Sequence, residues 1–260
     1  LAYIGLLFYL YRLTTSLFEE ETARRTVVYF AIFPTAFFFL AGYTESLFLL
    51  LTLAAFWYAH QKRWWLAGFL GFRASLTRLQ GVILILPLLY FYFKSERRVR
   101  PALLALFLIP LGAASFLFYL NSLGASLFNV YQSHLHAQFV LPWDNIIATV
   151  QNILSPEGTF IDIVNLIMTF IFLAMTITSF RAMPLSYSLY MALTIFVLLL
   201  RRTTAQPLVS MSRYVLTLFP AFMLWGLRGK NPWVNRLIVY PSIALLIYLC
   251  GQFAIWGWVA

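Results

Sequence analysis

Long apolar runs separated by short polar loops constrain the fold of this chain more than any other feature of its sequence. The chain is 62% hydrophobic and only 10% charged, whereas soluble domains are about half apolar and a quarter charged. A membrane-spanning helix needs about 20 predominantly apolar residues. We therefore expect an all-α, polytopic transmembrane protein with roughly nine or ten spans and short interfacial helices.

The apolar runs divide the chain into a series of predicted helices. Residues 1–260 are expected to form one transmembrane domain, because no polar stretch is long enough for a soluble domain. The predicted membrane-embedded helices are Leu1–Leu13, Thr26–Gly42, Glu45–His60, Trp64–Thr77, Leu79–Phe93, Ala102–Leu120, Ile161–Phe180, Leu185–Leu200, Tyr214–Leu227 and Leu237–Val259. Since Leu1 is not a methionine and lies within an apolar run, we expect the C-terminal portion of a longer protein, with further spans and a first external loop before it.

The connections between these helices carry the polar residues. Thr14–Arg25 and Arg201–Arg213 are predicted to be polar connecting segments. Asp144–Leu154 is predicted to form a short interfacial helix that Asp144 caps, because aspartate is a favoured N-cap residue. Glu157 is expected in a turn, and Asp162 at the start of a span.

The distribution of Lys and Arg predicts the orientation in the membrane. When alternate loops are assigned to opposite faces, thirteen of the 18 Lys and Arg residues fall on one face and five on the other. Lys and Arg are concentrated in the cytoplasmic loops of membrane proteins, so the face with thirteen is expected to be cytoplasmic. The turn at Tyr43, the polar section from Asn121 to Phe160 and the loop at Arg201 are then expected on the external face.

The segment Phe33–Leu51 contains the first candidate site residue. Two apolar runs meet there at a turn of four polar-capable residues, Tyr43–Ser46. Gly42 suits the left-handed residue that closes a helix, and Thr44 suits the N-cap of the next helix. Glu45 would then be a structural residue at the favourable end of the helix dipole. The alternative is that Glu45, a carboxylate between two uncharged runs, belongs to a functional site.

Five arginines on the predicted external face are the second group of candidates. An arginine at the centre of a membrane helix costs about 2.5–3.5 kcal/mol on insertion scales. The planar donor fork of arginine matches phosphate oxygens, which favours phosphate binding for Arg78 and Arg213 at the ends of predicted helices. For Arg201 and Arg202 we expect side chains that reach lipid headgroups, with substrate binding as the alternative. Arg73 lies deep in a predicted helix, with no partner predictable from sequence.

His134 and His136 lie in the long polar section. They are two residues apart, so they would not share one face of a helix, and no carboxylate is placed to complete a metal site. We therefore predict no metal site and interpret both histidines as polar loop residues, with substrate contact as the alternative. The single Cys250 lies in an apolar run and indicates neither a disulfide nor a metal site.

Three blocks of the sequence resemble the PIG-V-type mannosyltransferases, which belong to the GT-C superfamily of membrane glycosyltransferases and include GPI mannosyltransferase II. The blocks are FPTAFFFLAGYTESLFLLL (Phe33–Leu51), KRWWLAGFLGFRASLTRLQGV (Lys62–Val82) and SMSRYVLTLFP (Ser210–Pro220). Their order and spacing match those of the family, and the Tyr-Thr-Glu-Ser turn is the most specific block. Arg73 departs from the small residue usual at its position.

The resemblance implies an enzyme that transfers a sugar, with mannose expected, from a polyprenyl-phosphate donor to an acceptor on the external or lumenal face. It implies a catalytic aspartate beside a tryptophan on the first external loop, which we expect upstream of Leu1. Residues 1–260 alone are therefore expected to transfer no sugar. Trp143-Asp144 has the same dipeptide but lies in a different loop.

The resemblance also implies a set of substrate-binding residues: Tyr43, Glu45, Arg78, Arg213 and Tyr214. Arg78 and Arg213 are expected to bind the donor phosphate. Glu45 is expected to orient the acceptor hydroxyl or to hold one of these arginines. An inverting transfer needs a carboxylate base and cations that stabilise the departing phosphate, so no cofactor is expected.

The expected partners are the polyprenyl-phosphate-sugar donor, a glycan or glycolipid acceptor and membrane lipids, with no nucleic acid. The expected location is the bacterial plasma membrane, or the endoplasmic reticulum membrane in a eukaryote. The alternative function is a flippase or transporter for a lipid-linked sugar, which would also need external cations. A transporter predicts paired repeats of interrupted helices, and the sequence shows no such repeat.

Overall fold

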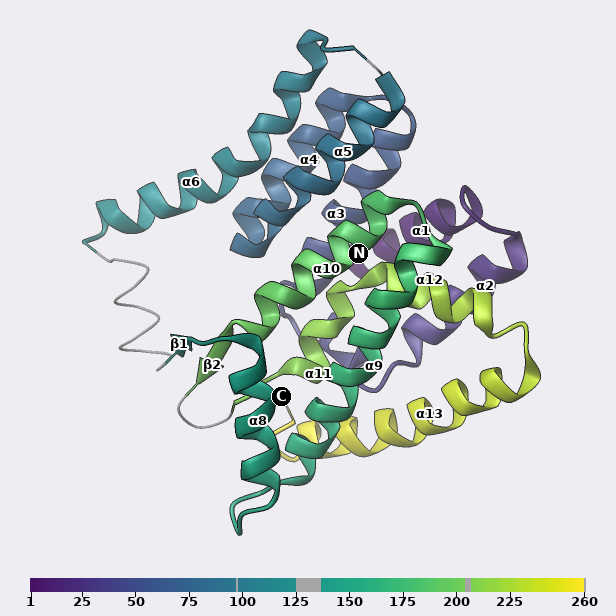
Figure 1. Cartoon of the computed structure of the whole chain (residues 1–260), viewed down its shortest axis with the longest axis vertical. Helices are drawn as coiled ribbons and strands as arrows, with labels where there is room; N and C mark the ends of the chain where they lie inside the picture. Colours follow the sequence, from purple (N-terminus) through teal and green to yellow (C-terminus); the bar gives the residue numbers. More distant parts are fainter. Residues whose placement is uncertain (97, 125–136, 204–206, 260) are drawn as a thin grey trace.

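The structure, a computed structural model, describes residues 1–96, 98–124, 137–203 and 207–259 (Figure 1). Within these ranges the regular secondary structure is helical apart from two three-residue strands. The α-helices are α1 (Ala2–Thr15), α2 (Glu20–Ala31), α3 (Glu45–His60), α4 (Trp64–Thr77), α5 (Ile85–Glu96), α6 (Leu108–Ser122), α8 (Pro142–Ile153), α9 (Phe160–Ala182), α10 (Leu185–Leu199), α11 (Met211–Tyr214), α12 (Phe219–Arg228) and α13 (Pro232–Ala254). The 3-10 helices are η1 (Ala36–Phe39), η2 (Leu79–Leu84), η3 (Pro101–Phe107) and η4 (Val215–Thr217). The strands are β1 (Ala137–Phe139) and β2 (Arg201–Thr203).

The helices pack around one large apolar core, and a second, smaller apolar cluster contains Phe38, Ile161, Leu249 and Val259. α3 packs against both α1 and α4, α4 packs against α6, and α2 packs against α12. Aromatic rings from α2, α9 and α12, with one from the segment before η1, meet in this core: Phe30, Phe33, Phe172, Phe222 and Trp225. Aromatic pairs of this kind add about 0.5–1.5 kcal/mol each beyond area burial, so this cluster holds three helices from distant parts of the chain together.

Glycines allow α4 to approach η3 and α6 closely. A Cβ atom at Gly68 would overlap the carbonyl oxygen of Ala105, and one at Gly112 would overlap the carbonyl oxygen of Phe72. At Gly71 a Cβ would lie 2.6 Å from Cγ1 of Ile109. Small residues at helix interfaces let backbones come close, which is the usual way that helices pack in membranes.

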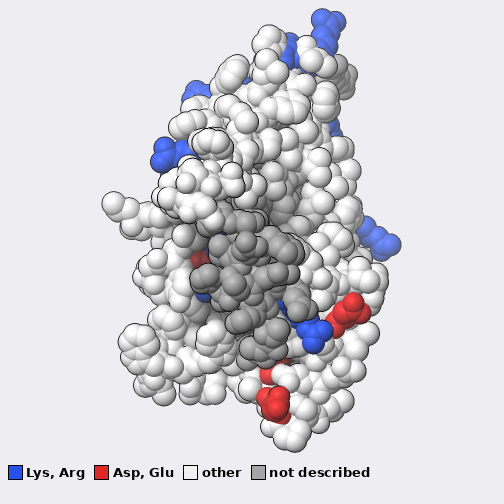
Figure 2. All heavy atoms as spheres, turned by 90° about the vertical axis from the view of Figure 1, so that its left-hand side faces the viewer, with Lys and Arg blue, Asp and Glu red and all other residues white. Residues whose placement is uncertain are grey.

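Among the described residues, three helical segments are long and apolar enough to cross a membrane: Pro101–Ser122, which joins η3 and α6, then α9 and α13. α3 and α10 are shorter apolar helices. The face drawn in Figure 2 is mostly uncharged, with few and scattered charged side chains. The all-helical expectation is confirmed for the described residues. These residues contain three candidate membrane-spanning helices, whereas we predicted nine or ten spans.

The predicted continuous helix Thr26–Gly42 is wrong, because the chain breaks within it. α2 begins at Glu20, inside the segment predicted to be a polar connection, and ends at Ala31. Pro34 then prevents the helix from continuing, since proline lacks a backbone N–H and its ring disfavours the α conformation of the preceding residue. The chain resumes as the short η1 helix before Gly42, whose φ of +78° places it in the left-handed region.

The predicted helix Tyr214–Leu227 is also interrupted. α11 and η4 are separated from α12 by Leu218, and Pro220 occupies the first turn of α12. Proline is accepted there because the first-turn N–H groups have no partner within the helix. The predicted helices Leu79–Phe93 and Ala102–Leu120 each begin instead with a 3-10 segment, η2 and η3.

Part of the segment Arg201–Arg213, which was predicted to be a polar loop, forms β2. β2 pairs with β1 in an antiparallel register that sets Arg202 opposite Gln138. The prediction that Asp144 caps a helix is wrong: α8 begins at Pro142 with Leu141 at the N-cap, which leaves Asp144 in the first turn. Asp162 does begin a long helix, because it forms a capping box with Thr159 at the start of α9.

Candidate functional site

The most prominent polar cluster in the described chain is built on the carboxylate of Glu45, which is the first residue of α3 and is completely buried. One of its oxygens, Oε1, lies 2.7 Å from Nη1 of Arg78. The same oxygen accepts a hydrogen bond from Nε of Arg213 at 2.8 Å and lies 2.7 Å from Nη2 of that arginine. Three segments that are distant in the sequence therefore converge on one atom.

The turn before α3 places Glu45 at the helix N-terminus. Gly42 adopts a positive φ that lets the chain reverse. Ser46 donates its hydroxyl to the carbonyl oxygen of Phe39 at 2.6 Å, which fixes the turn to η1. Thr44 holds the N-cap position but its side chain makes no capping hydrogen bond. Glu45 therefore lies at the positive end of the α3 dipole, which favours the charged carboxylate.

Arg78 lies at the junction between α4 and η2. Its backbone is extended, with φ −147° and ψ 131°, so α4 ends there and the side chain turns toward α3. The N–H of Gly81 donates to the carbonyl oxygen of Arg78 at 2.8 Å, and a Cβ at Gly81 would lie 2.6 Å from the backbone nitrogen of Ser75. A glycine is therefore required for this tight junction to close against α4.

Arg213 is held by the residue that precedes it. The N–H of Ser212 donates to Oδ1 of Asn165 at 2.8 Å, and its carbonyl oxygen accepts from Oγ1 of Thr35 at 2.7 Å. All three of these side chains are buried. The backbone of α11 is thereby fixed to α9 on one side and to the turn after α2 on the other.

Two tyrosine rings pack against the arginines. The guanidinium carbon of Arg213 lies 3.9 Å from the ring centroid of Tyr43. The ring centroid of Tyr214 lies within 6 Å of three guanidinium carbons: Arg78 at 5.4 Å, Arg201 at 5.6 Å and Arg213 at 5.7 Å. Nη1 of Arg201 also donates to the Tyr214 hydroxyl at 2.9 Å. The quadrupole of an aromatic ring attracts cations. The Tyr214 ring therefore stabilises three positively charged side chains close to one another.

The cluster carries more positive than negative charge. The cluster contains three arginines, Arg78, Arg201 and Arg213, and one carboxylate, that of Glu45, which leaves two positive charges in excess. Two of the buried donors nearby have no hydrogen-bond partner among the described residues: Nε of Arg201, and Nε2 of Gln80, which lies two residues after Arg78. Buried donors without acceptors are costly, so the chemistry of this site suits an anion that brings several acceptor oxygens.

The cluster reaches the surface of the molecule. The side chains of Arg78 and Arg213 retain 16% and 14% of their exposure, whereas that of Glu45 retains none. Tyr43 is 43% exposed. Arg213 therefore lies beneath the ring of Tyr43, and both arginines remain partly accessible to a ligand, while the buried Glu45 holds them from below.

The structure brings together most of the predicted site residues. Tyr43, Glu45, Arg78, Arg213 and Tyr214 form one cluster, and Arg201 joins it through Tyr214. Arg202 lies beside Arg201 in β2. His134 and His136 lie outside the described residues. Among the residues that the structure describes, no three His, Cys, Asp or Glu side chains are grouped as metal ligands.

Sequence reasoning missed several supporting residues. These are Asn165, Thr35 and Ser212, which are uncharged polar residues on separate elements. No sequence motif or regular spacing indicates that they contact one another. Arg201 was expected to reach lipid headgroups, but its contact with Tyr214 places it in the cluster. Arg73, whose partner was not predicted, is exposed and stacks on Phe69 at 5.8 Å.

Comparison of the chain with models of protein families, with characterised proteins and with solved structures gave no match.

Proposed function

We propose that the protein is a membrane glycosyltransferase that transfers a sugar, specifically mannose, from a polyprenyl-phosphate donor to a glycan or glycolipid acceptor. One observation carries the proposal: three blocks that resemble PIG-V-type mannosyltransferases, far apart in sequence, supply one arginine cluster. Glu45 comes from the first block, Arg78 from the second, and Arg213 with Tyr214 from the third.

The excess positive charge supports a phosphate ligand. Guanidinium groups bind phosphate oxygens through two parallel donors, and such charge-assisted hydrogen bonds are about twice as strong as neutral ones. In the transfer reaction the acceptor hydroxyl oxygen forms a bond to the sugar C1 while the bond between C1 and the phosphate oxygen breaks. The electron pair of the broken bond remains on the phosphate, and the hydroxyl proton passes to a carboxylate base. Arg78, Arg201 and Arg213 would stabilise that developing charge by prearranged donors.

Glu45 takes a positioning role in this proposal. Its Oε1 is contacted by both Arg78 and Arg213, so the carboxylate orients the two donor forks. Its buried Oε2 has no hydrogen-bond partner among the described residues and would be able to accept a hydrogen bond from the acceptor hydroxyl. Tyr43, which covers Arg213 and is partly exposed, is placed to contact the substrate at the entrance.

The proposal includes a multi-pass arrangement with roughly nine or ten crossings, in which shorter helices complete the spans beside the three long ones. The arginine cluster would lie near the external face, since the loops with most Lys and Arg are assigned to the cytoplasm. The membrane would be the bacterial plasma membrane, or the endoplasmic reticulum membrane in a eukaryote.

A flippase or transporter for a lipid-linked sugar is the second candidate. The interrupted segments favour it: the chain breaks between α2 and η1 and again between η4 and α12, and broken helices are typical of transporter binding sites. Such a protein would move the intact donor across the bilayer without cleaving the bond between sugar and phosphate.

The test uses the whole protein that contains this chain, reconstituted in liposomes with radiolabelled polyprenyl-phosphate mannose and cell-envelope acceptors. We expect labelled acceptor to form, and formation to fall by at least about tenfold in Arg78→Ala and Arg213→Ala, since each loses a charged hydrogen bond. Arg236→Ala removes a cation that stacks on the exposed Trp233 and serves as the matched control.

The outcomes separate the two candidates. Release of unlabelled polyprenyl phosphate together with labelled acceptor supports transfer. Movement of intact labelled donor between leaflets without its cleavage would replace the transferase with the transporter. If the protein neither transfers nor moves the donor, both functions are wrong.

A further inference from the structure

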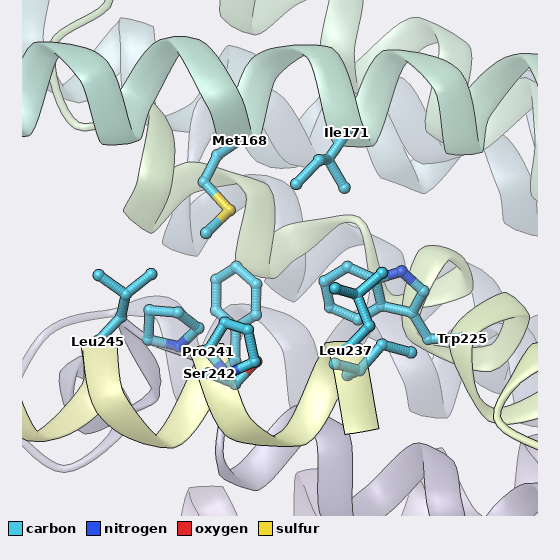
Figure 3. A pocket seen from close by; sticks show the side chains of 10 residues that line it. Met168, Ile171, Trp225, Leu237, Pro241, Ser242 and Leu245 are labelled. Carbon is cyan, nitrogen blue, oxygen red and sulfur yellow. The ribbon is translucent and has the colours of Figure 1, made fainter. Parts of the chain in front are cut away.

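A second feature of the molecule is an apolar cavity of about 250 Å³ between α9, α12 and α13 (Figure 3). Met168 and Ile171 project into it from α9, Trp225 from α12, and Pro241 and Ser242 from α13. Every lining residue except Ser242 is apolar. An apolar cavity of about 150 Å³ stays free of water and binds benzene, so this larger one is suited to a hydrocarbon.

The cavity exists because α13 contacts the rest of the molecule mainly near its ends. Near its start, the hydroxyl of Tyr29 donates to Oδ1 of Asn235 at 2.6 Å. Near its end, the ring of Phe253 packs on Phe37 and Phe38, with centroids 5.2 and 5.5 Å apart. The central part of α13, around Pro241, bridges the space between these two contacts.

Two of the helices that border the cavity favour a location for it in the hydrocarbon region of a membrane. α9 and α13 are both long and apolar enough to span, so the surroundings of a gap between them are lipid chains. A polar ligand would leave its hydrogen-bonding groups unpaired there, which is costly. The lining and these surroundings therefore favour a hydrocarbon chain as the occupant.

Two segments that line the cavity also hold the backbone next to the arginine cluster. Phe33 and Pro34 line the cavity, and the next residue, Thr35, donates to the carbonyl oxygen of Ser212. Met168 lies about one helical turn from Asn165, which binds the N–H of Ser212. Both contacts hold Ser212, the residue before Arg213. The elements that line the cavity therefore also fix the backbone beside Arg213 in the arginine cluster.

We propose that the cavity between α9, α12 and α13 binds the isoprenoid chain of a polyprenyl phosphate whose phosphate occupies the arginine cluster. This inference rests on the proposed function, because it assigns the tail of the same donor. A molecule with an anionic head and a long apolar chain matches both features at once: excess positive charge at one end and an apolar cavity along the adjoining elements.

The first experiment compares the binding of a long and a short ligand to a variant in which a large side chain occupies the cavity. Ser242→Trp inserts a large side chain at the single polar lining position, and Ile247→Trp adds the same side chain at a position of α13 that is 69% exposed. We measure the binding of undecaprenyl phosphate and dimethylallyl phosphate to the whole detergent-solubilised protein. Undecaprenyl phosphate affinity should fall about tenfold in Ser242→Trp alone, because a few methylene groups lose their contacts. Dimethylallyl phosphate affinity should be equal in all three proteins.

The outcomes distinguish this inference from the proposed function. If wild-type protein does not bind undecaprenyl phosphate, the proposed function fails and this inference fails with it. If wild-type and Ser242→Trp proteins bind it equally, the cavity assignment alone is overturned.

A second measurement needs no variant, so it does not depend on how Ser242→Trp folds. A polyprenyl phosphate with a diazirine on its chain is photoactivated with the wild-type protein, and the crosslinked peptides are identified by mass spectrometry. We expect crosslinks within residues 168–171 and 237–245, and their loss when undecaprenyl phosphate competes. Equal competition by phosphatidylglycerol would assign the cavity to bilayer lipid and overturn the proposal, as would crosslinks confined to other helices.

Discussion

Arg213 contacts Glu45 through both Nε and Nη2, at 2.8 and 2.7 Å from the same carboxylate oxygen, although 168 residues separate the two positions. Because Arg78 lies 2.7 Å from that oxygen as well, the start of α3, the end of α4 and the α11 segment depend on one buried carboxylate. Removing its charge would leave two guanidinium groups facing each other with little exposure to water.

Glu45→Gln should therefore destabilise the protein strongly. The substitution keeps the shape of the side chain but removes the negative charge, and breaking a buried ion pair by removing one partner costs about 3–5 kcal/mol. Unfolding by denaturant in detergent should show a loss in this range. Glu21→Gln on α2, where the side chain is 65% exposed, should change stability by less than about 0.5 kcal/mol. Equal stability of the two variants would contradict the role assigned to Glu45.

Arg78→Lys and Arg213→Lys should weaken binding of the polyprenyl-phosphate donor while the protein still folds. Lysine retains the positive charge but lacks the planar donor fork, so we expect losses of about 1–3 kcal/mol in binding free energy, the range for hydrogen bonds to charged groups. The measurement is the equilibrium binding of radiolabelled donor. Arg73→Lys on α4, where the arginine is exposed and contacts Phe69, is the control, and it should bind as wild type does.

The two faces of the protein can be distinguished by chemical labelling. Thr44 and Lys94 are both exposed. Thr44 precedes α3 on the face expected to be external, and Lys94 lies in the last turn of α5 on the face expected to be cytoplasmic. Single cysteines at these positions, in a Cys250→Ser background, should react with a membrane-impermeant thiol reagent from opposite sides of sealed vesicles. Thr44→Cys should react from the external side. Labelling of both cysteines from one side would contradict the orientation drawn from the thirteen-to-five distribution of Lys and Arg.

Much of the helical architecture was predictable because apolar runs and their polar boundaries are local features. The predicted bounds Glu45–His60 and Trp64–Thr77 agree with α3 and α4. The breaks at Pro34 and Pro220 were missed because hydropathy alone does not detect the loss of a backbone donor, although each proline was visible in the sequence. The β1–β2 pairing joins Ala137 to Thr203, and no local pattern predicts a contact over that separation.

The candidate site was predictable in part for a similar reason. Charged residues in an apolar chain need partners, which indicated Glu45, Arg78 and Arg213 before their contacts were known. The support of Arg213 by Asn165 and Thr35 was not predictable, because it depends on how α9 and α2 pack. The same holds for Arg201, whose place in the cluster is set by the Tyr214 hydroxyl.

Gly68→Ala should destabilise the packing of α4. A Cβ at this position would overlap the carbonyl oxygen of Ala105, and backbone atoms cannot move aside as a flexible side chain can. We expect a loss of about 1–3 kcal/mol from overpacking, measured by thermal unfolding. Gly251→Ala on α13 has no atom within 4 Å of the new Cβ and should be neutral or slightly stabilising, because alanine favours helix over glycine by about 1 kcal/mol. A stable Gly68→Ala variant would show that α4 and η3 can separate at little cost.

Tyr214 provides a graded test of the arginine cluster, because its ring and its hydroxyl have separate contacts. Tyr214→Phe removes the hydroxyl that accepts from Arg201 but keeps the ring beside three guanidinium groups. Losing one hydrogen bond to a charged group should cost donor binding about 1.5 kcal/mol, or about tenfold in affinity.

Tyr214→Leu removes the ring as well, so the arginines lose its quadrupole and repel one another more strongly. Each cation–π contact at a partly buried site contributes about 0.5–2 kcal/mol, so donor affinity should fall further than in Tyr214→Phe. Tyr240→Leu, at a position of α13 that is 67% exposed, controls for the loss of an aromatic ring and should bind donor normally. Equal affinities for the phenylalanine and leucine variants would mean that the ring does not hold the arginines, and that Tyr214 acts through its hydroxyl alone.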